Sequence, residues 1–294
     1  PMPFLRRITR RQYFLYQYVL ALLAGIGAIA LEFAPTHPMQ FLEGDMIISH
    51  TCGNTVSTAM VTVYYILVLL ALVFAVLVFI APEKKLHYIH FVSIIGVRIL
   101  VNVLLSVCIL KVFVGKPRPC FFDKCGYPIT DNVAHLYGLV GVEGDISKCT
   151  ASRFKINDAM RSFPSGHSAV ASAALCLVCI VLSSLVSECT KWRRITTERV
   201  YVISAAIVLG ISLFITASRV TDYLHFVEDT IAGFLIGVAV AIATNNSMQT
   251  LFLYTTDPSN ATQMVDVESQ EDSPSASSGF IKRYMFQSVP TRLG

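Results

Sequence analysis

Three short stretches of the sequence contain residue types that bind and attack a phosphate ester. In chain order, the candidate residues are Lys111 and Arg118, then Ser165, Gly166 and His167, and then Arg219, His225 and Asp229. A phosphate ester under attack carries negative charge on its oxygens, so its reaction needs cations and N–H donors aimed at those oxygens. Three cations, two imidazoles and a carboxylate therefore indicate phosphoryl-transfer chemistry.

The cations and the serine-glycine turn are suited to hold the phosphate. Arg118 and Arg219 can each give two parallel hydrogen bonds, whereas Lys111 acts as a point charge. Ser165-Gly166 precedes an apolar run, which predicts a turn that opens a helix with free backbone N–H groups facing the anion. The serine hydroxyl adds a donor, and glycine lets the backbone come close. We assign substrate phosphate binding to these five residues.

The histidines and the carboxylate are assigned to catalysis. His225 and Asp229 are four residues apart, so on a helix the carboxylate can bind one ring nitrogen while the other attacks phosphorus. This forms a phosphohistidine. His167 then protonates the departing alkoxide and later takes a proton from water. We expect a bell-shaped pH profile, because one histidine must be neutral while the other is protonated.

The three stretches together resemble the signatures of the type 2 phosphatidic acid phosphatase superfamily. The matching segments are KVFVGKPRP (111–119), FPSGHS (163–168) and SRVTDYLHFVED (218–229), and they most resemble the eukaryotic lipid phosphate phosphatases. The resemblance covers about residues 10–245 and implies a metal-free phosphohistidine mechanism with the same roles. Cys120 stands where relatives often have histidine, and Leu224 and Phe226 replace a common lysine and histidine, which changes the rim of the site.

The composition indicates a membrane protein. The 294 residues are 54% hydrophobic and only 14% charged, which is too apolar for an ordinary soluble domain. A helix that crosses about 30 Å of hydrocarbon needs about 20 apolar residues. Six runs qualify, at 13–33, 56–80, 91–114, 167–186, 200–217 and 226–243. We expect an all-α bundle of six transmembrane helices in a phosphatase domain at 1–245, and a cytosolic, largely disordered tail at 246–294.

Basic residues in the short flanks predict the orientation. They lie before the first span, between the second and third, and between the fourth and fifth: Arg6, Arg7, Arg10, Arg11, Lys84, Lys85, Lys191, Arg193, Arg194 and Arg199. The first connection, 34–55, has none. Both termini are therefore expected in the cytosol, and the site at the non-cytosolic helix ends of the plasma membrane, endoplasmic reticulum or Golgi. A cleaved signal peptide at 13–33 is the alternative, and it leaves the active side unchanged.

Further residues near the site carry structural expectations. Asp222 and Tyr223 are expected to shape the loop and hold Arg219, Lys116 to anchor the chain at the membrane interface, and Glu32 has no assigned role. Four cysteines fall in expected non-cytosolic segments, where disulfides can form: Cys52, Cys120, Cys125 and Cys149. Two pairings would staple the long third connection, Cys120 with Cys125 or Cys125 with Cys149, and the sequence leaves the connectivity open.

The resemblance, more than the residues themselves, indicates the substrate. Expected substrates are phosphatidate, lysophosphatidate, diacylglycerol pyrophosphate and sphingoid phosphates. Expected partners are the lipid phosphate and membrane lipids, with no nucleic acid, and a homo-oligomer stays open. Three alternatives remain. They are a lipid phosphotransferase with an alcohol acceptor, a phosphatase of sugar phosphates or polyprenyl diphosphates, and a non-catalytic lipid-binding relative, in which one histidine should have been lost.

Overall fold

The computed structural model describes residues 10–128, 142–188 and 191–256. These residues form helices and one isolated bridge, with no strand among them. The long helices are α1 (Arg10–Phe33), α2 (Thr58–Phe79), α3 (Pro82–Val114), α7 (Gly166–Glu188), α8 (Lys191–Thr221) and α9 (Val227–Thr256). Each contains a stretch long and apolar enough to cross a membrane. The prediction of an all-α integral membrane protein with six spanning helices is confirmed.

Three helices extend well beyond the apolar runs that predicted them, namely α3, α8 and α9. α3 begins at Pro82 instead of near residue 91, because its polar first turns continue the helix and proline suits the first helical position. α9 continues to Thr256, past the expected end of the sixth span and into the segment expected to be a tail. Residues 257–294, which hold most of that expected tail, lie outside the described residues.

The chain divides into two compact units, one of residues 17–245 and one that combines 1–16 with 246–294. In the described part of the smaller unit, the Tyr13 hydroxyl donates to the Met248 carbonyl at 3.0 Å. The larger unit contains all the candidate site residues.

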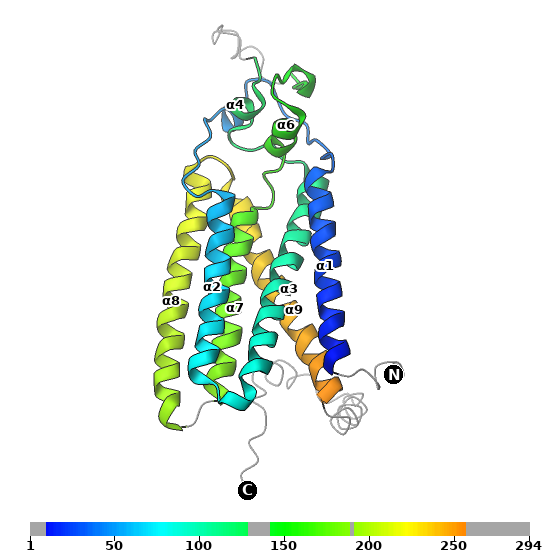
Figure 1. Ribbon diagram of the computed structural model, residues 1–294. Coiled ribbons are helices and arrows are strands. Elements are labelled where there is room, and N and C mark those ends of the chain that lie inside the picture. The colour runs from blue at the N-terminus through cyan, green and yellow to red at the C-terminus, as the bar shows by residue number, and fades with distance from the viewer. Residues whose placement is uncertain (1–9, 129–141, 189–190, 257–294) are drawn as a thin grey trace, which may run out of the picture. The chain divides into compact units, whose positions relative to one another are not determined.

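In the larger unit, α7 packs against α2, α3 and α8 and is buried along most of its length. Alanine and serine on α7 let neighbouring backbones approach closely, as small residues do between membrane helices. Ser172, for example, donates its hydroxyl to the Phe234 carbonyl of α9 at 2.9 Å. The helices run side by side, so the ends of α3 and α8 and the starts of α7 and α9 lie at the same end of the bundle (Figure 1).

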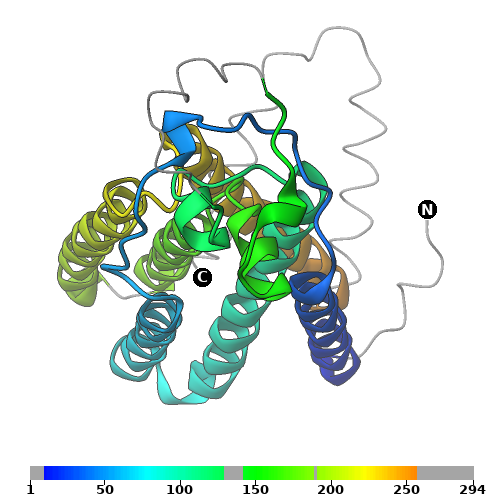
Figure 2. The same ribbon diagram turned by 90° about the horizontal axis from the view of Figure 1, so that it is seen from above.

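A loop-rich cap lies over this end of the bundle. It contains α4 (Phe121–Cys125), α6 (Arg153–Ala159) and the short 3-10 helices η2 (Met46–Ile48) and η3 (Ile146–Lys148). Viewed from above, the segment between α1 and α2 crosses over the helix ends (Figure 2). The cap has its own apolar core, with Phe41, Ile48, Phe121, Phe122 and Met160 among its buried members.

Two disulfides tie the cap together. Cys125 bonds to Cys149, one of the pairings that the sequence left open. Cys52 bonds to Cys120 and so joins the α1–α2 segment to the first phosphate-binding stretch. Cys120, which stands where relatives often have histidine, is therefore half of a covalent link.

Candidate active site

The helix ends under the cap bring the three stretches together. Lys111 lies in the last turn of α3, and Gly166 is the first residue of α7. A Cβ atom added at Gly166 would be 3.9 Å from Lys111 Nζ, so the lysine reaches the start of α7. Arg219 lies near the end of α8, and His225 lies just before α9.

His225 is held by hydrogen bonds at both ring nitrogens. Its Nδ1 is 2.6 Å from the Ser162 carbonyl oxygen, and its Nε2 is 3.2 Å from Arg118 Nη1. A carbonyl can only accept and a guanidinium can only donate, so we assign the proton to Nδ1 and the lone pair to Nε2. The ring is 3% exposed. Burial, with the charges of Arg118 and Lys111, lowers the pKa of His225 well below its usual value. These contacts favour a neutral imidazole whose Nε2 lone pair accepts a hydrogen bond from Arg118.

The expected contact between Asp229 and the His225 ring is absent, because α9 begins at Val227 and the two residues do not share a helix. Asp229 Oδ2 accepts instead from the Phe226 backbone N–H at 3.0 Å and from the Ser162 hydroxyl at 2.5 Å. The first of these bonds caps the start of α9. Asp229 therefore reaches His225 only through Ser162, whose hydroxyl binds the carboxylate and whose carbonyl binds the ring.

Lys116 completes this arrangement instead of serving only as an interfacial anchor. Its Nζ lies 2.8 Å from Asp229 Oδ1, 2.7 Å from Glu228 Oε1 and 4.3 Å from the centre of the Phe226 ring. Asp229 is fully buried, so the lysine compensates a charge that would otherwise be costly to bury.

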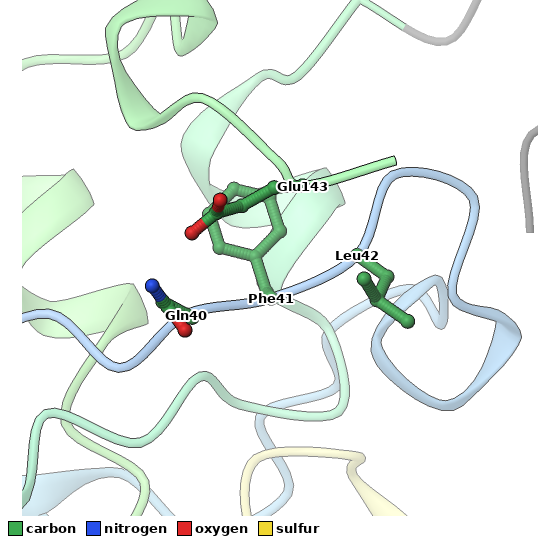
Figure 3. Close-up of a pocket in the computed structure, with 4 residues that line it drawn as sticks. All are labelled: Gln40, Phe41, Leu42 and Glu143. Atoms are coloured by element: carbon green, nitrogen blue, oxygen red, sulfur yellow. The ribbon is translucent and has the colours of Figure 1, made fainter. Parts of the chain in front are cut away.

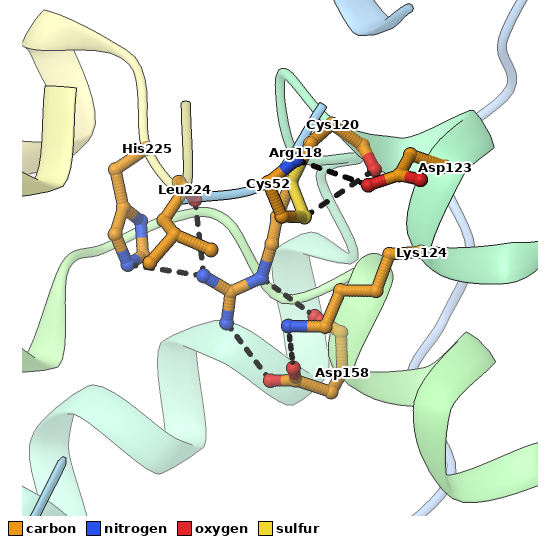
Figure 4. The surroundings of a disulfide bond; sticks show 8 residues. All are labelled: Cys52, Arg118, Cys120, Asp123, Lys124, Asp158, Leu224 and His225. Atoms are coloured by element: carbon orange, nitrogen blue, oxygen red, sulfur yellow. Dashed lines mark hydrogen bonds and ion pairs between the residues drawn. A yellow bond between two sulfur atoms is a disulfide. The ribbon is translucent and has the colours of Figure 1, made fainter. Parts of the chain in front are cut away.

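Arg118 is anchored by Asp158, which sequence reasoning missed (Figure 4). Its Nε donates to the Asp158 carbonyl and its Nη2 to Asp158 Oδ1, both at 2.8 Å. Lys124 also pairs with this carboxylate. Burial raises the pKa of Asp158, but Arg118 and Lys124 outweigh burial and hold it below its usual value. Asp158 lies before the second stretch at no spacing that marks it as functional, so the sequence alone did not indicate its role.

Arg219 is anchored by its neighbours in the third stretch. Its Nη2 donates to Asp222 Oδ2 and to Ser218 Oγ, each at 2.9 Å, and the side chain is 1% exposed. The expectation that Asp222 holds Arg219 is confirmed. Tyr223 has φ 55°, in the left-handed region. The chain turns back there, so the His225 backbone N–H donates to the Arg219 carbonyl at 3.2 Å.

The second stretch starts α7. The hydroxyl of Ser165 accepts from the hydroxyl of Ser168 at 3.2 Å, and the Ser165 backbone N–H donates to the Asp229 carbonyl at 2.9 Å. In the first helical turn the backbone N–H groups have no helical acceptor, so those of Gly166 and His167 are available to an anion. His167 Nε2 is buried and has no hydrogen-bond partner among the residues that the structure describes. A buried imidazole nitrogen of this kind is suited to proton transfer with a bound ligand.

Two other features lie apart from this arrangement. Within the described ranges, no three His, Cys, Asp or Glu side chains are grouped so that they could hold a metal ion. A pocket of about 290 Å³ lies in the cap at the Leu42–Glu143 bridge, lined by Gln40, Phe41, Leu42 and Glu143 (Figure 3). None of its lining residues is a candidate site residue.

Comparison with known proteins identifies the family. Residues 86–253, more than half of the chain, match the PAP2 superfamily. The chain belongs to this superfamily. The resemblance seen in the three stretches is therefore confirmed, and all of the candidate site residues fall inside the matched range.

The PAP2 chain is also similar to curated proteins. It is 26% identical to a PA-phosphatase related-family protein of Dictyostelium discoideum over 79% of this chain and 62% of the relative. It is 35% identical to the probable diacylglycerol pyrophosphate phosphatase 1 of Schizosaccharomyces pombe, over 47% and 46%, and 30% identical to lipid phosphate phosphatase 2 of Arabidopsis thaliana, over 45% and 42%. The chain thus spans less than two thirds of each relative. No solved structure matches.

Proposed function

We propose that this PAP2 protein is a membrane lipid phosphate phosphatase that works through a phosphohistidine on His225, without a metal ion. The observation that carries the proposal is the state of that ring. Its Nδ1–H is held by the Ser162 carbonyl, and its Nε2 lone pair points at Arg118, a cation able to bind phosphate. A neutral imidazole fixed in this way is a nucleophile aimed at a bound anion.

The cations hold the phosphoryl group during the reaction. When substrate binds, the Arg118 Nη1 donor that rests on His225 Nε2 transfers to a phosphate oxygen and frees the lone pair. Arg219 and Lys111 bind the remaining oxygens, together with the N–H groups at the start of α7. Arg118 and Arg219 are already anchored by Asp158 and Asp222, so these two donors need little reorganisation as charge develops on the oxygens.

In the first step, His225 Nε2 attacks phosphorus and the bond from phosphorus to the lipid oxygen breaks. His167 donates its Nε2 proton to the leaving alkoxide, which departs as an alcohol. The imidazole of His225 becomes positively charged on phosphorylation. Asp229 stabilises this charge through Ser162, and so acts as a positioning residue that does not touch the ring.

In the second step, His167 takes a proton from water, and the resulting hydroxide attacks the phosphohistidine. The phosphorus–nitrogen bond breaks, its electron pair returns to Nε2 and inorganic phosphate leaves. Both histidines are then in their starting protonation states.

The position of the site supports a lipid substrate. It lies at the ends of helices that can cross a membrane, where a headgroup is found while its acyl chains stay among the helices. Relatives of this chain include a probable diacylglycerol pyrophosphate phosphatase and a lipid phosphate phosphatase. We therefore propose phosphatidate, lysophosphatidate, diacylglycerol pyrophosphate and sphingoid phosphates as substrates, a non-cytosolic site, cytosolic termini and a catalytic domain at 1–245.

Phosphate release from these lipids in detergent micelles, with EDTA present, tests the proposal. We expect activity in the wild type, inhibition by vanadate, and loss of activity in His225→Asn. Activity that needs added magnesium contradicts the metal-free reaction, and full activity in His225→Asn contradicts the nucleophile. Adding a short alcohol distinguishes hydrolysis from phosphotransfer, because a transferase would form the alkyl phosphate.

A further inference from the structure

The α1–α2 loop, residues 34–57, is bonded to the first phosphate-binding stretch along much of its length. The backbone N–H groups of His37, Met39 and His50 donate to the carbonyls of Val112, Gly115 and Pro119, at 3.0, 2.9 and 3.1 Å. Sequence reasoning used this loop for its lack of basic residues and for Cys52 as a possible disulfide partner. In the structure it runs beside the segment that carries Arg118.

The same loop is bonded to the stretch that carries Arg219. Thr55 donates from its backbone N to Asp222 Oδ2 at 2.8 Å and from its hydroxyl to Asp222 Oδ1 at 2.6 Å. The Gly53 N–H donates to the Asp222 carbonyl at 2.8 Å. A Cβ atom at Gly53 would lie 2.7 Å from Asp222 Oδ1, so only glycine allows this approach. The His50 ring stacks on Tyr223, with centres 4.1 Å apart.

A covalent bond fixes the loop between these two attachments. Cys52 is bonded to the buried Cys120, which follows Arg118 by two residues (Figure 4). The Cys52 backbone N–H also donates to Asp123 Oδ2 at 3.0 Å. From Cys52 to Thr55, four residues therefore link the Arg118 segment to the carboxylate that holds Arg219.

We propose that this link, locked by the Cys52–Cys120 disulfide, sets the spacing of the two phosphate-binding arginines. Asp222 receives one hydrogen bond from Arg219 and three bonds from the loop, counting its carbonyl. If the loop moves, Asp222 and the guanidinium it holds move with it. The inference rests on the proposed function, because it assigns Cys52, Cys120 and Thr55 as positioning residues for the same phosphate.

The test compares variants of the full chain in detergent. Cys52→Ser/Cys120→Ser removes the covalent link, and Thr55→Val removes one hydroxyl bond without disturbing the disulfide. Thr62→Val is the matched control, because the Thr62 hydroxyl donates to the Thr58 carbonyl within α2 and to no other residue in the described part of the chain. Cys125→Ser/Cys149→Ser removes the other disulfide of the cap. The readouts are kcat/KM for phosphatidate and the rise in Tm that orthovanadate produces.

We expect kcat/KM to fall at least about tenfold in Cys52→Ser/Cys120→Ser, and about threefold to tenfold in Thr55→Val, which is the range for loss of a typical intramolecular hydrogen bond. The vanadate shift should shrink in both and stay at the wild-type value in Thr62→Val and Cys125→Ser/Cys149→Ser. Combining Thr55→Val with Cys52→Ser/Cys120→Ser should lower kcat/KM little further than Cys52→Ser/Cys120→Ser alone, because both changes act through the same loop.

Several results would overturn the inference. One is a vanadate-induced rise in Tm that is unchanged in Cys52→Ser/Cys120→Ser and in Thr55→Val. Another is a loss of kcat/KM and of the vanadate shift in Cys125→Ser/Cys149→Ser as large as in Cys52→Ser/Cys120→Ser. A third is the finding of free thiols at Cys52 and Cys120 in non-reducing peptide maps. If the wild type hydrolyses no lipid phosphate, the proposed function fails. The vanadate shift, which needs only anion binding, still decides whether the loop positions the arginines.

Discussion

Replacing Ser162 with alanine separates two ways in which Asp229 could serve His225. If the carboxylate acted on the ring directly, the Ser162 hydroxyl would be dispensable. In the structure that hydroxyl donates to Asp229 Oδ2 at 2.5 Å, while the Ser162 carbonyl holds the ring. A hydrogen bond to a charged group contributes about 1.5–3 kcal/mol. If that contribution is realised as the ring gains charge, kcat should fall about 10- to 150-fold in Ser162→Ala.

The assay is steady-state kinetics on phosphatidate in mixed micelles. We expect kcat to fall and KM to stay near the wild-type value, because the hydroxyl faces Asp229 and not the phosphate. Ser183→Ala is the matched control, since among the described residues the Ser183 hydroxyl bonds just to the Ile180 carbonyl of its own helix. Wild-type kcat in Ser162→Ala, in protein shown to be folded, would refute the indirect role of Asp229.

The remaining predictions concern the two histidines and the anchor of Arg118. Since burial and nearby cations lower the pKa of His225 in the folded protein, fewer protons are bound there than in the unfolded chain. Stability, measured as Tm against pH, should therefore be full above about pH 6.5 and fall on acidification below it, whereas the acidic fall of kcat/KM should come at lower pH, where the folded-state imidazole gains its proton. Asp158→Asn removes the carboxylate that holds the Arg118 guanidinium and should raise KM about tenfold. Asp145→Asn, at an exposed position, should leave KM unchanged. Equal KM values in the two variants would contradict the role of Asp158 as the anchor of Arg118. His167→Asn should lower kcat on phosphatidate about 10²- to 10⁴-fold but affect an ester with an acidic phenol leaving group less, and an equal loss on both substrates would argue against an acid role.

Helix identity was predictable from the sequence because the spans are long apolar runs, and the ends of those runs placed the site residues together. Helix boundaries were less predictable where polar residues continue a helix. At the start of α3, Lys84 and Lys85 lie inside the helix instead of in a connection. Hydropathy indicates which residues avoid water and so locates the membrane-spanning part of a helix. It does not locate the helix end, because a helix can continue beyond the membrane.

The contacts within the site were less predictable than its members. The spacing of His225 and Asp229 suggested one helix face, but α9 begins between them and its first turn uses the carboxylate as a cap. Ser162 and Asp158 act through a backbone carbonyl and a long-range ion pair, and neither leaves a pattern in the sequence. The Cys52–Cys120 pairing joins residues 68 apart, so only the folded cap could reveal it.

The most direct measurement is the site of phosphorylation. Purified His167→Asn, in which release from the enzyme should be slowed, is mixed with radiolabelled phosphatidate, quenched and mapped by mass spectrometry under alkaline conditions. The account predicts an acid-labile, alkali-stable phosphate on His225 that is absent from the His225→Asn double variant. A label on another residue, or rapid hydrolysis by His225→Asn with no labelled enzyme, would contradict it.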